Sequence, residues 1–155
     1  MVAINDASIK DAEAILALQK LAYQSEAKIY NDWSLPPLTQ SIESLCEEFA
    51  TSTVLRATID GRIVGSVRGR RNGDTCVIGR LIVHPEFQRQ GIGSQLLRSI
   101  EDRFKGVVSR FELFTGNRSE DNIRLYHRHG YAIVRAQPLS QAVSIIFLEK
   151  SADKD

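Results

Sequence analysis

Residues 75–104 of the chain read TCVIGRLIVHPEFQRQGIGSQLLRSIEDRF, and this stretch decides the fold. Its first part, Thr75 to Val83, is rich in β-branched and aliphatic side chains and stops before Pro85, which is typical of a strand. A helix is then expected from the Gly91-Ile92-Gly93 turn to about Phe104, because apolar residues recur at helical spacing: Ile92, Leu96, Leu97, Ile100 and Phe104. Arg110 to Thr115 forms the next strand. The sequence therefore predicts two parallel strands joined across this helix.

Strand and helix patterns on both sides of this stretch extend it into one mixed sheet. Two hairpin signals, Asp60-Gly61 and Asn72-Gly73, separate the upstream strands, because both positions of such turns accept positive φ. The other expected strands cover residues 2–4, 54–59, 63–70, 131–134 and 143–149. Helical patterns run from a Ser8 cap to about residue 23, from about 39 to 49, and from a Ser119 cap to Gly130. We therefore expect an α/β fold with a mixed, mostly antiparallel central sheet and helices on both faces.

The size and composition of the chain limit what it can be. With 155 residues, of which 43% are hydrophobic and 25% charged, it fits one globular domain at residues 1–150, followed by a frayed tail at 151–155. A net charge of +1 argues against nucleic acid as a main partner. No apolar run is long enough to span a membrane, and the first residues, MVAIND, do not match a signal peptide. We therefore expect a cytoplasmic protein with reduced cysteines.

The loop between the strand and the helix carries the strongest functional signal. It reads QRQGIGS over residues 88–94, and its glycines let the backbone approach a ligand closely. The start of the following helix offers unpaired N–H groups and a positive dipole end, which suits a pyrophosphate, and Arg89 adds a charge. The loop is not a dinucleotide fingerprint, because Leu96 stands where the third glycine is due. Taken alone, it leaves phosphate binding and an ordinary strand–helix turn equally open.

Three separated blocks, taken together, match one known family in order. They are Leu81-Ile82-Val83-His84-Pro85, Gln88-x-x-Gly91-x-Gly93 and Asn122-x-x-x-Tyr126-x-x-x-Gly130-Tyr131. With the order of strands and helices, over about residues 2–149, they resemble the GNAT superfamily of acetyl-CoA-dependent N-acetyltransferases. The resemblance is weakest between Tyr23 and Leu38, where members of that family differ most. It implies that the parallel strands splay apart after a bulge and accept acetyl-CoA in the gap.

The resemblance also implies roles for particular residues. Backbone groups at Leu81, Ile82 and Val83 would bind the pantetheine arm and polarise the thioester carbonyl. The loop would wrap the pyrophosphate through Gln88, Arg89, Gln90, Gly91, Ile92, Gly93 and Ser94. Asn122 would bond the pantetheine, and Tyr126 would protonate the leaving sulfur. Asn122 and Tyr126 are four residues apart, so they share one helix face.

The residues on the acceptor side are less clearly marked. An alkylamine has a pKa of about 10.4, so its deprotonation at pH 7.5 costs roughly 4 kcal/mol, and a carboxylate would help by taking the proton. Glu112, on the strand that flanks the gap, is the first candidate base, although a surface glutamate fits the pattern equally well. Four further residues are candidates for substrate binding: Glu26, Tyr30, Asp32 and Trp33. For Glu26 and Asp32 the alternative is a solvated loop, and for Tyr30 and Trp33 it is that their rings fasten this loop to the core. Pro36-Pro37 should break any helix there.

These patterns favour an enzyme that moves an acetyl group from acetyl-CoA to the amine of a small molecule or peptide, by direct attack in a ternary complex. Neither Cys46 nor Cys76 lies in the matched motif, which disfavours a covalent acetyl-enzyme. The rival hypothesis is a non-catalytic acyl-CoA-binding or regulatory module. The histidines lack the spacing of metal ligands, so no metal is expected. The sequence leaves open the acceptor, the base, the use of longer acyl-CoAs and the oligomeric state, with a homodimer through exposed strand edges as one option.

Overall fold

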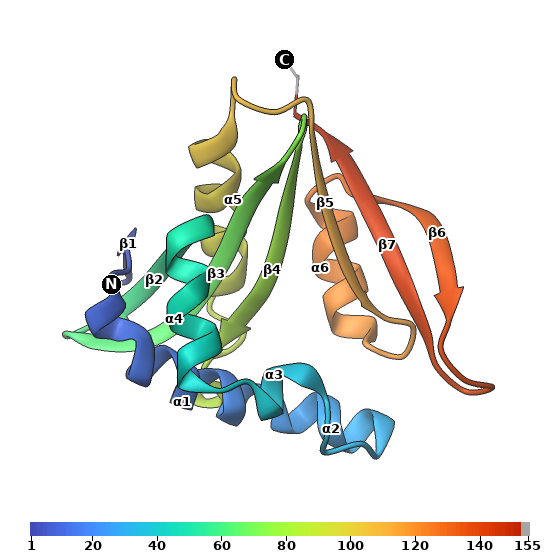
Figure 1. Cartoon of the computed structure of the whole chain (residues 1–155), viewed down its shortest axis with the longest axis horizontal. Coiled ribbons are helices and arrows are strands. Elements are labelled where there is room, and N and C mark those ends of the chain that lie inside the picture. Colours follow the sequence, from blue (N-terminus) through green and yellow to red (C-terminus); the bar gives the residue numbers. More distant parts are fainter. Residues whose placement is uncertain (153–155) are drawn as a thin grey trace.

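A seven-stranded mixed sheet runs through the computed structural model, which describes residues 1–152 (Figure 1). Only β4 and β5 are parallel neighbours, and the other neighbouring pairs are antiparallel. In spatial order the strands are β1 (Ala3–Asp6), β2 (Thr53–Ile59), β3 (Arg62–Asn72), β4 (Thr75–Val83), β5 (Arg110–Gly116), β7 (Ser144–Ser151) and β6 (Ala132–Pro138). The predicted fold class is confirmed, including the parallel step between β4 and β5.

Helices cover both faces of the sheet (Figure 1). One face carries α1 (Ala12–Ala22) and α4 (Ile42–Thr51), and the other carries α5 (Ile92–Phe104) and α6 (Glu120–Arg128). Two short helices, α2 (Gln24–Tyr30) and α3 (Pro36–Thr39), lie next to α1 below the open ends of the strands. Two short 3-10 turns, Ile9–Asp11 and Pro85–Phe87, precede α1 and α5. Within the described residues, no helix is long and apolar enough to cross a membrane.

Turn chemistry explains the two hairpins, although the second is displaced from its predicted position. Asp60 and Gly61 both have positive φ, 51° and 80°, as expected for the turn between β2 and β3. In the next hairpin Asn72 pairs with Thr75, so the turn consists of residues 73 and 74 instead of Asn72-Gly73. Gly73 supplies the positive φ, 64°, and Asn72 stays in the strand.

Residues 24–39 are more helical than the sequence pattern indicates. Asn31 ends α2 in the left-handed conformation, with φ 51°. Pro36 and Pro37, which were expected to break any helix, instead begin α3 at its first positions. Proline is tolerated there because the missing N–H would have no partner within the helix.

Two clusters of buried apolar side chains hold the layers together. The larger lies between the sheet and α5 and α6 and includes Val67, Leu96, Ile100 and Phe111. The smaller lies under α1 and α4, around Leu45. These contacts fix the start of α5 at the end of β4, where the predicted cofactor loop lies.

The parallel strands pair at one end only. Their register joins Thr75 to Arg110, Cys76 to Phe111 and Val77 to Glu112, and no pairing continues beyond Val77 among the described residues. Figure 1 shows β4 and β5 diverging from this closed end toward α1 and α2. The splay that the resemblance implied is therefore present.

A β-bulge in β4 accompanies the splay. On the β3 side, Arg68 pairs with Gly79 and Ser66 pairs with Ile82, so Arg80 and Leu81 together oppose one residue. Arg80 has a left-handed φ of 52°, which is uncommon for a residue other than glycine. The bulge changes the direction of β4 where its pairing with β5 stops.

The first two residues of the predicted 151–155 tail, Ser151 and Ala152, are held in the structure. Ser151 is the last residue of β7, and the amide of Ala152 donates a hydrogen bond to the Ser109 carbonyl, 3.0 Å away. Residues 153–155 of the predicted tail lie outside the described residues.

Candidate functional site

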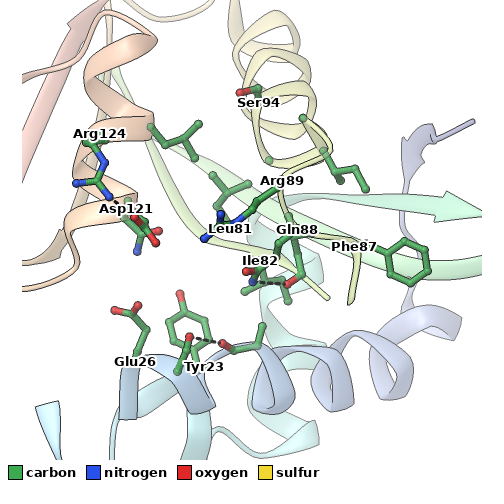
Figure 2. A pocket seen from close by; sticks show the side chains of 18 of the residues that line it. Tyr23, Glu26, Leu81, Ile82, Phe87, Gln88, Arg89, Ser94, Asp121 and Arg124 are labelled. Atoms are coloured by element: carbon green, nitrogen blue, oxygen red, sulfur yellow. Dashed lines mark hydrogen bonds and ion pairs between the residues drawn. The ribbon is translucent and has the colours of Figure 1, made fainter. Parts of the chain in front are cut away.

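The gap between β4 and β5 opens into a pocket of about 540 Å³. Figure 2 shows its walls, which are the end of β4, the loop and start of α5, α6, and the junction of α1 and α2. Ten of the predicted cofactor-binding residues line it: Leu81, Ile82, Val83, Gln88, Arg89, Gly91, Ile92, Gly93, Ser94 and Asn122. Gln90 lines a separate hollow, beside Val2 and Ile59.

The loop presents the start of α5 to the pocket. Gly91 caps the helix in the left-handed conformation, with φ 82°, which lets the chain turn directly from the loop into the helix. The first hydrogen bond of the helix is donated by the Gln95 amide to the carbonyl of Gly91, 3.0 Å away. The amides of residues 92–94 precede it and have no partner within the helix. This part of the pocket is therefore suited to a phosphate or pyrophosphate.

Helix α6 forms the opposite wall. The Asn122 side-chain amide donates to the Thr115 hydroxyl of β5, 3.3 Å away, which orients the side chain. Its carbonyl oxygen has no partner among the described residues and is available to a ligand N–H. Arg124 and Arg128 also line this wall. The sequence analysis did not assign either arginine to the site, because a charge every fourth residue is ordinary on a solvated helix. Only their position on the same helix as Asn122 could have indicated that they line the pocket.

Glu26 and Tyr23 close the other end of the pocket, and Figure 2 shows both pointing into it from the junction of α1 and α2. Glu26 accepts a short hydrogen bond from the Ser119 hydroxyl. The Tyr30 hydroxyl lies 2.7 Å from Ser119 Oγ and accepts from the Arg118 amide at 3.0 Å. Because Ser119 gives its one hydrogen to Glu26, Tyr30 donates to Ser119. This chain of hydrogen bonds ends on the Glu26 carboxylate and fixes its position.

Ser119 has a different role from the one predicted. It precedes α6 and is 2% exposed, but its side chain makes no capping hydrogen bond. The hydroxyl is used by Glu26 and Tyr30, which are far away in the sequence. A cap signal is local, so it does not reveal a competing partner from another helix.

Tyr126, predicted to bind the cofactor, does not line the pocket but is buried near Tyr23 and Glu26, which do. It is 7% exposed, and its ring lies 6.1 Å from the ring of Tyr131. Burial raises the pKa of Tyr126, and the nearby Tyr23 and Glu26 raise it further. The hydroxyl therefore keeps its proton throughout the neutral range. Burial also raises the pKa of Tyr23, a residue that sequence reasoning did not assign to the site.

Several predicted acceptor-side residues lie outside the pocket. Glu112 pairs with Val77 at the closed end of the two strands and does not line it. Asp32 accepts hydrogen bonds from the Ser34 amide and hydroxyl, at 2.9 and 2.6 Å, which lower the pKa of its carboxyl. Trp33 is 55% exposed. Glu26 is thus the one carboxylate among these candidates that lines the pocket.

The two cysteines lie away from this pocket. Neither Cys46 nor Cys76 lines it, and burial raises the pKa of the Cys76 thiol to about 12. Within residues 1–152, no group of histidine, cysteine or carboxylate side chains is arranged to hold a metal ion.

Solved structures share this fold. The coenzyme A complex of the PaiA N-acetyltransferase from Thermoplasma acidophilum has a TM-score of 0.80 and 18% identity, covering 97% of this chain and 99% of that one. The ribosomal-protein-S18-alanine N-acetyltransferase of Escherichia coli has a TM-score of 0.82 and 17% identity, with coverage of 100% and 96%. YncA, a putative acetyltransferase from Salmonella typhimurium solved with acetyl-CoA, has a TM-score of 0.78 and 17% identity, with coverage of 99% and 95%.

Sequence comparison adds a curated relative and a family. The protein YqkA of Bacillus subtilis is 28% identical over 120 residues, which are 77% of this chain but only 34% of YqkA. The chain thus spans about a third of that relative's length. The model of the family described as "Acetyltransferase (GNAT) family" matches residues 13–131, which include β4, the loop and α6. Since this match covers most of the chain and contains the pocket, the chain belongs to the GNAT family of acetyltransferases.

Proposed function

We propose that this protein transfers the acetyl group of acetyl-CoA to an amine by direct attack in a ternary complex. One observation carries the proposal. A single pocket joins a helix start suited to phosphates, an unpaired stretch of strand, and the Glu26 carboxylate, with the Tyr126 side chain buried next to it. Each of these suits one part of the reaction, namely the pyrophosphate, the pantetheine arm with its thioester, and the amine.

The donor half of the pocket would hold acetyl-CoA. Because β4 has no strand partner on its β5 side beyond Val77, backbone groups of Leu81 and Val83 would pair there with the amides of pantetheine. The Val83 carbonyl accepts from the Gln88 side-chain amide at 3.4 Å, and this contact would give way to the ligand. A free N–H there would also stabilise the negative oxygen of the tetrahedral intermediate. The amides at the start of α5 and Arg89 would bind the pyrophosphate, and Asn122 would hold the arm from the opposite wall.

The acceptor half would move the protons. The amine nitrogen attacks the thioester carbonyl carbon, the new C–N bond forms and the C–S bond breaks. Glu26 replaces Glu112 as our candidate base, because it lines the pocket and has no cationic partner among the described residues. Tyr126 would donate to the leaving sulfur. Because its pKa is raised, we expect it to contribute about 10²-fold, the lower end for a general acid.

A thiol-release assay tests the proposal. Acetyl-CoA is offered with a library of amines, and acetyl-CoA binding is measured separately by calorimetry. We expect micromolar affinity, about −8 kcal/mol, and thiol release that depends on the amine. Absence of binding at millimolar acetyl-CoA would refute the proposal. Binding with slow, amine-independent hydrolysis would instead favour the non-catalytic acyl-CoA-binding module.

A further inference from the structure

A buried charged network lies on the α1 face of the sheet, next to the acceptor end of the pocket. Arg68 of β3 is 3% exposed. It donates to the Glu48 carboxylate at 3.1 Å and to the Gln19 side-chain carbonyl at 2.5 Å. Glu48 therefore neutralises Arg68, and no anionic charge of this network is left for a second cation.

Arg80 is that second cation, and it lacks an anion. Its guanidinium lies beside the Tyr23 hydroxyl and close to Arg68. Its Nε is buried without a hydrogen-bond partner, as are the Nε atoms of Arg56 and Arg68. No carboxylate among residues 1–152 forms an ion pair with it. A buried guanidinium donor without a partner is unfavourable, so an anionic ligand that reached it would be bound.

The backbone at Arg80 supports a functional reading of this arginine. Arg80 holds a left-handed φ of 52° at the bulge, directly before Leu81. Strained conformations of this kind persist where the surrounding structure holds a group for function. Arg80 does not itself line the pocket, but its side chain interacts with Tyr23, which lines the pocket together with Glu26.

We infer that the acceptor is an amine that also carries a carboxylate, such as an amino acid, and that Arg80 binds this carboxylate. The inference rests on the proposed function and specifies its acceptor. The planar guanidinium matches a carboxylate in two parallel hydrogen bonds. A carboxylate held at Arg80 would place the attached amine near Glu26, because both side chains interact with Tyr23.

The same charges discriminate against other amines. A polyamine would bring further positive charge toward Arg80 and Arg68. An internal peptide or amide acceptor would leave Arg80 without its anion. Both penalties act on the wrong substrates and not on an amino acid.

The experiment compares an amino acid with its uncharged amide and with a polyamine, using wild type, Arg80→Gln and Arg80→Lys. For wild type we expect kcat/KM to be at least about 100-fold higher for the amino acid, the range for loss of a buried charged contact. Arg80→Gln should lower this preference to below about threefold by affecting the amino acid alone, and Arg80→Lys should restore part of it. Arg89→Gln is the matched control: another arginine with positive φ, 66°, but on the cofactor loop. It should raise KM for acetyl-CoA and leave the preference unchanged.

Three results would overturn the inference: equal use of amino acid and amide by wild type, preference for the polyamine, or an equal loss with both acceptors in Arg80→Gln.

If acetyl-CoA binds but no amine is acetylated, the proposed function fails, and the carboxylate site is then judged by calorimetry. If the amino acid binds to the CoA-saturated wild-type protein and Arg80→Gln abolishes this binding, the carboxylate site is supported. Binding that is absent, or unchanged in the variant, would refute it.

Discussion

Replacing Gly93 with alanine should separate the stability of the protein from its affinity for acetyl-CoA. A Cβ at this position would lie 3.7 Å from Leu125 Cδ2 and 3.8 Å from Val83 Cγ2, which are ordinary contacts. Gly93 lies in the first turn of α5 and does not have positive φ. Alanine is favoured over glycine in a helix by at most about 1 kcal/mol. We therefore expect Tm to be unchanged or raised by up to roughly 2–4 °C.

The same methyl group should weaken cofactor binding. Val83 and Leu125 both line the pocket, so the added Cβ occupies space beside the amides expected to hold the pyrophosphate. Loss of one hydrogen bond to a charged group costs about 1.5–3 kcal/mol, which corresponds to roughly 10- to 150-fold in Kd. Gly93→Val should lose more. Calorimetry with acetyl-CoA measures the affinity, and thermal unfolding measures the stability.

Gln95→Ala is the matched control for this test. Gln95 lies in the same helix and does not line the cofactor pocket, and its replacement by alanine also raises the helix propensity. Its affinity for acetyl-CoA should equal that of wild type. If Gly93→Val folds and binds acetyl-CoA within twofold of wild type, the loop is only a structural turn and the proposed cofactor site is refuted.

Four other variants or measurements test the acceptor end and the thiols. Tyr126→Phe should lower single-turnover acetyl transfer by about 10²-fold with acetyl-CoA affinity intact, and equal rates would make Tyr126 a packing residue. Because its pKa is raised, wild type should show no loss of rate from tyrosine ionisation up to about pH 10. Glu26→Gln should lower the rate at pH 7.5, and the gap should narrow as pH approaches the amine pKa of about 10.4; a constant gap would exclude Glu26 as base. With a pKa raised to about 12, Cys76 should resist a thiol reagent at pH 8 until the protein is denatured, whereas half-buried Cys46 reacts first.

The cofactor half of the site could be predicted from the sequence because its signals are local. The predicted strand Thr75–Val83 has the bounds of β4, and the predicted helix end at Phe104 is the end of α5. In this region the apolar spacing, the glycines and the proline all indicate the same structure. Ten predicted residues accordingly line one pocket.

The acceptor half could not be predicted in the same way, because long-range contacts decide it. Residues 24–30 read QSEAKIY and bury only Ala27, so no apolar stripe identified α2. Glu112 was placed correctly on a strand beside the gap, but local pattern does not tell which end of that strand stays paired. Glu26 reaches the pocket only because α2 is held against the beginning of α6 by Tyr30 and Ser119.

Two departures from local rules lie at this acceptor end. Arg80 adopts a left-handed conformation without being glycine, and its Nε is buried without a partner. Ser119 stands at a cap position but does not cap. A sequence that otherwise follows helix and strand rules is expected to depart from them where function requires it. We therefore expect the choice of acceptor to depend on these residues. The Arg80 and Glu26 substitutions should therefore change which amine is used, whereas the Gly93 substitution should change only how tightly acetyl-CoA is held.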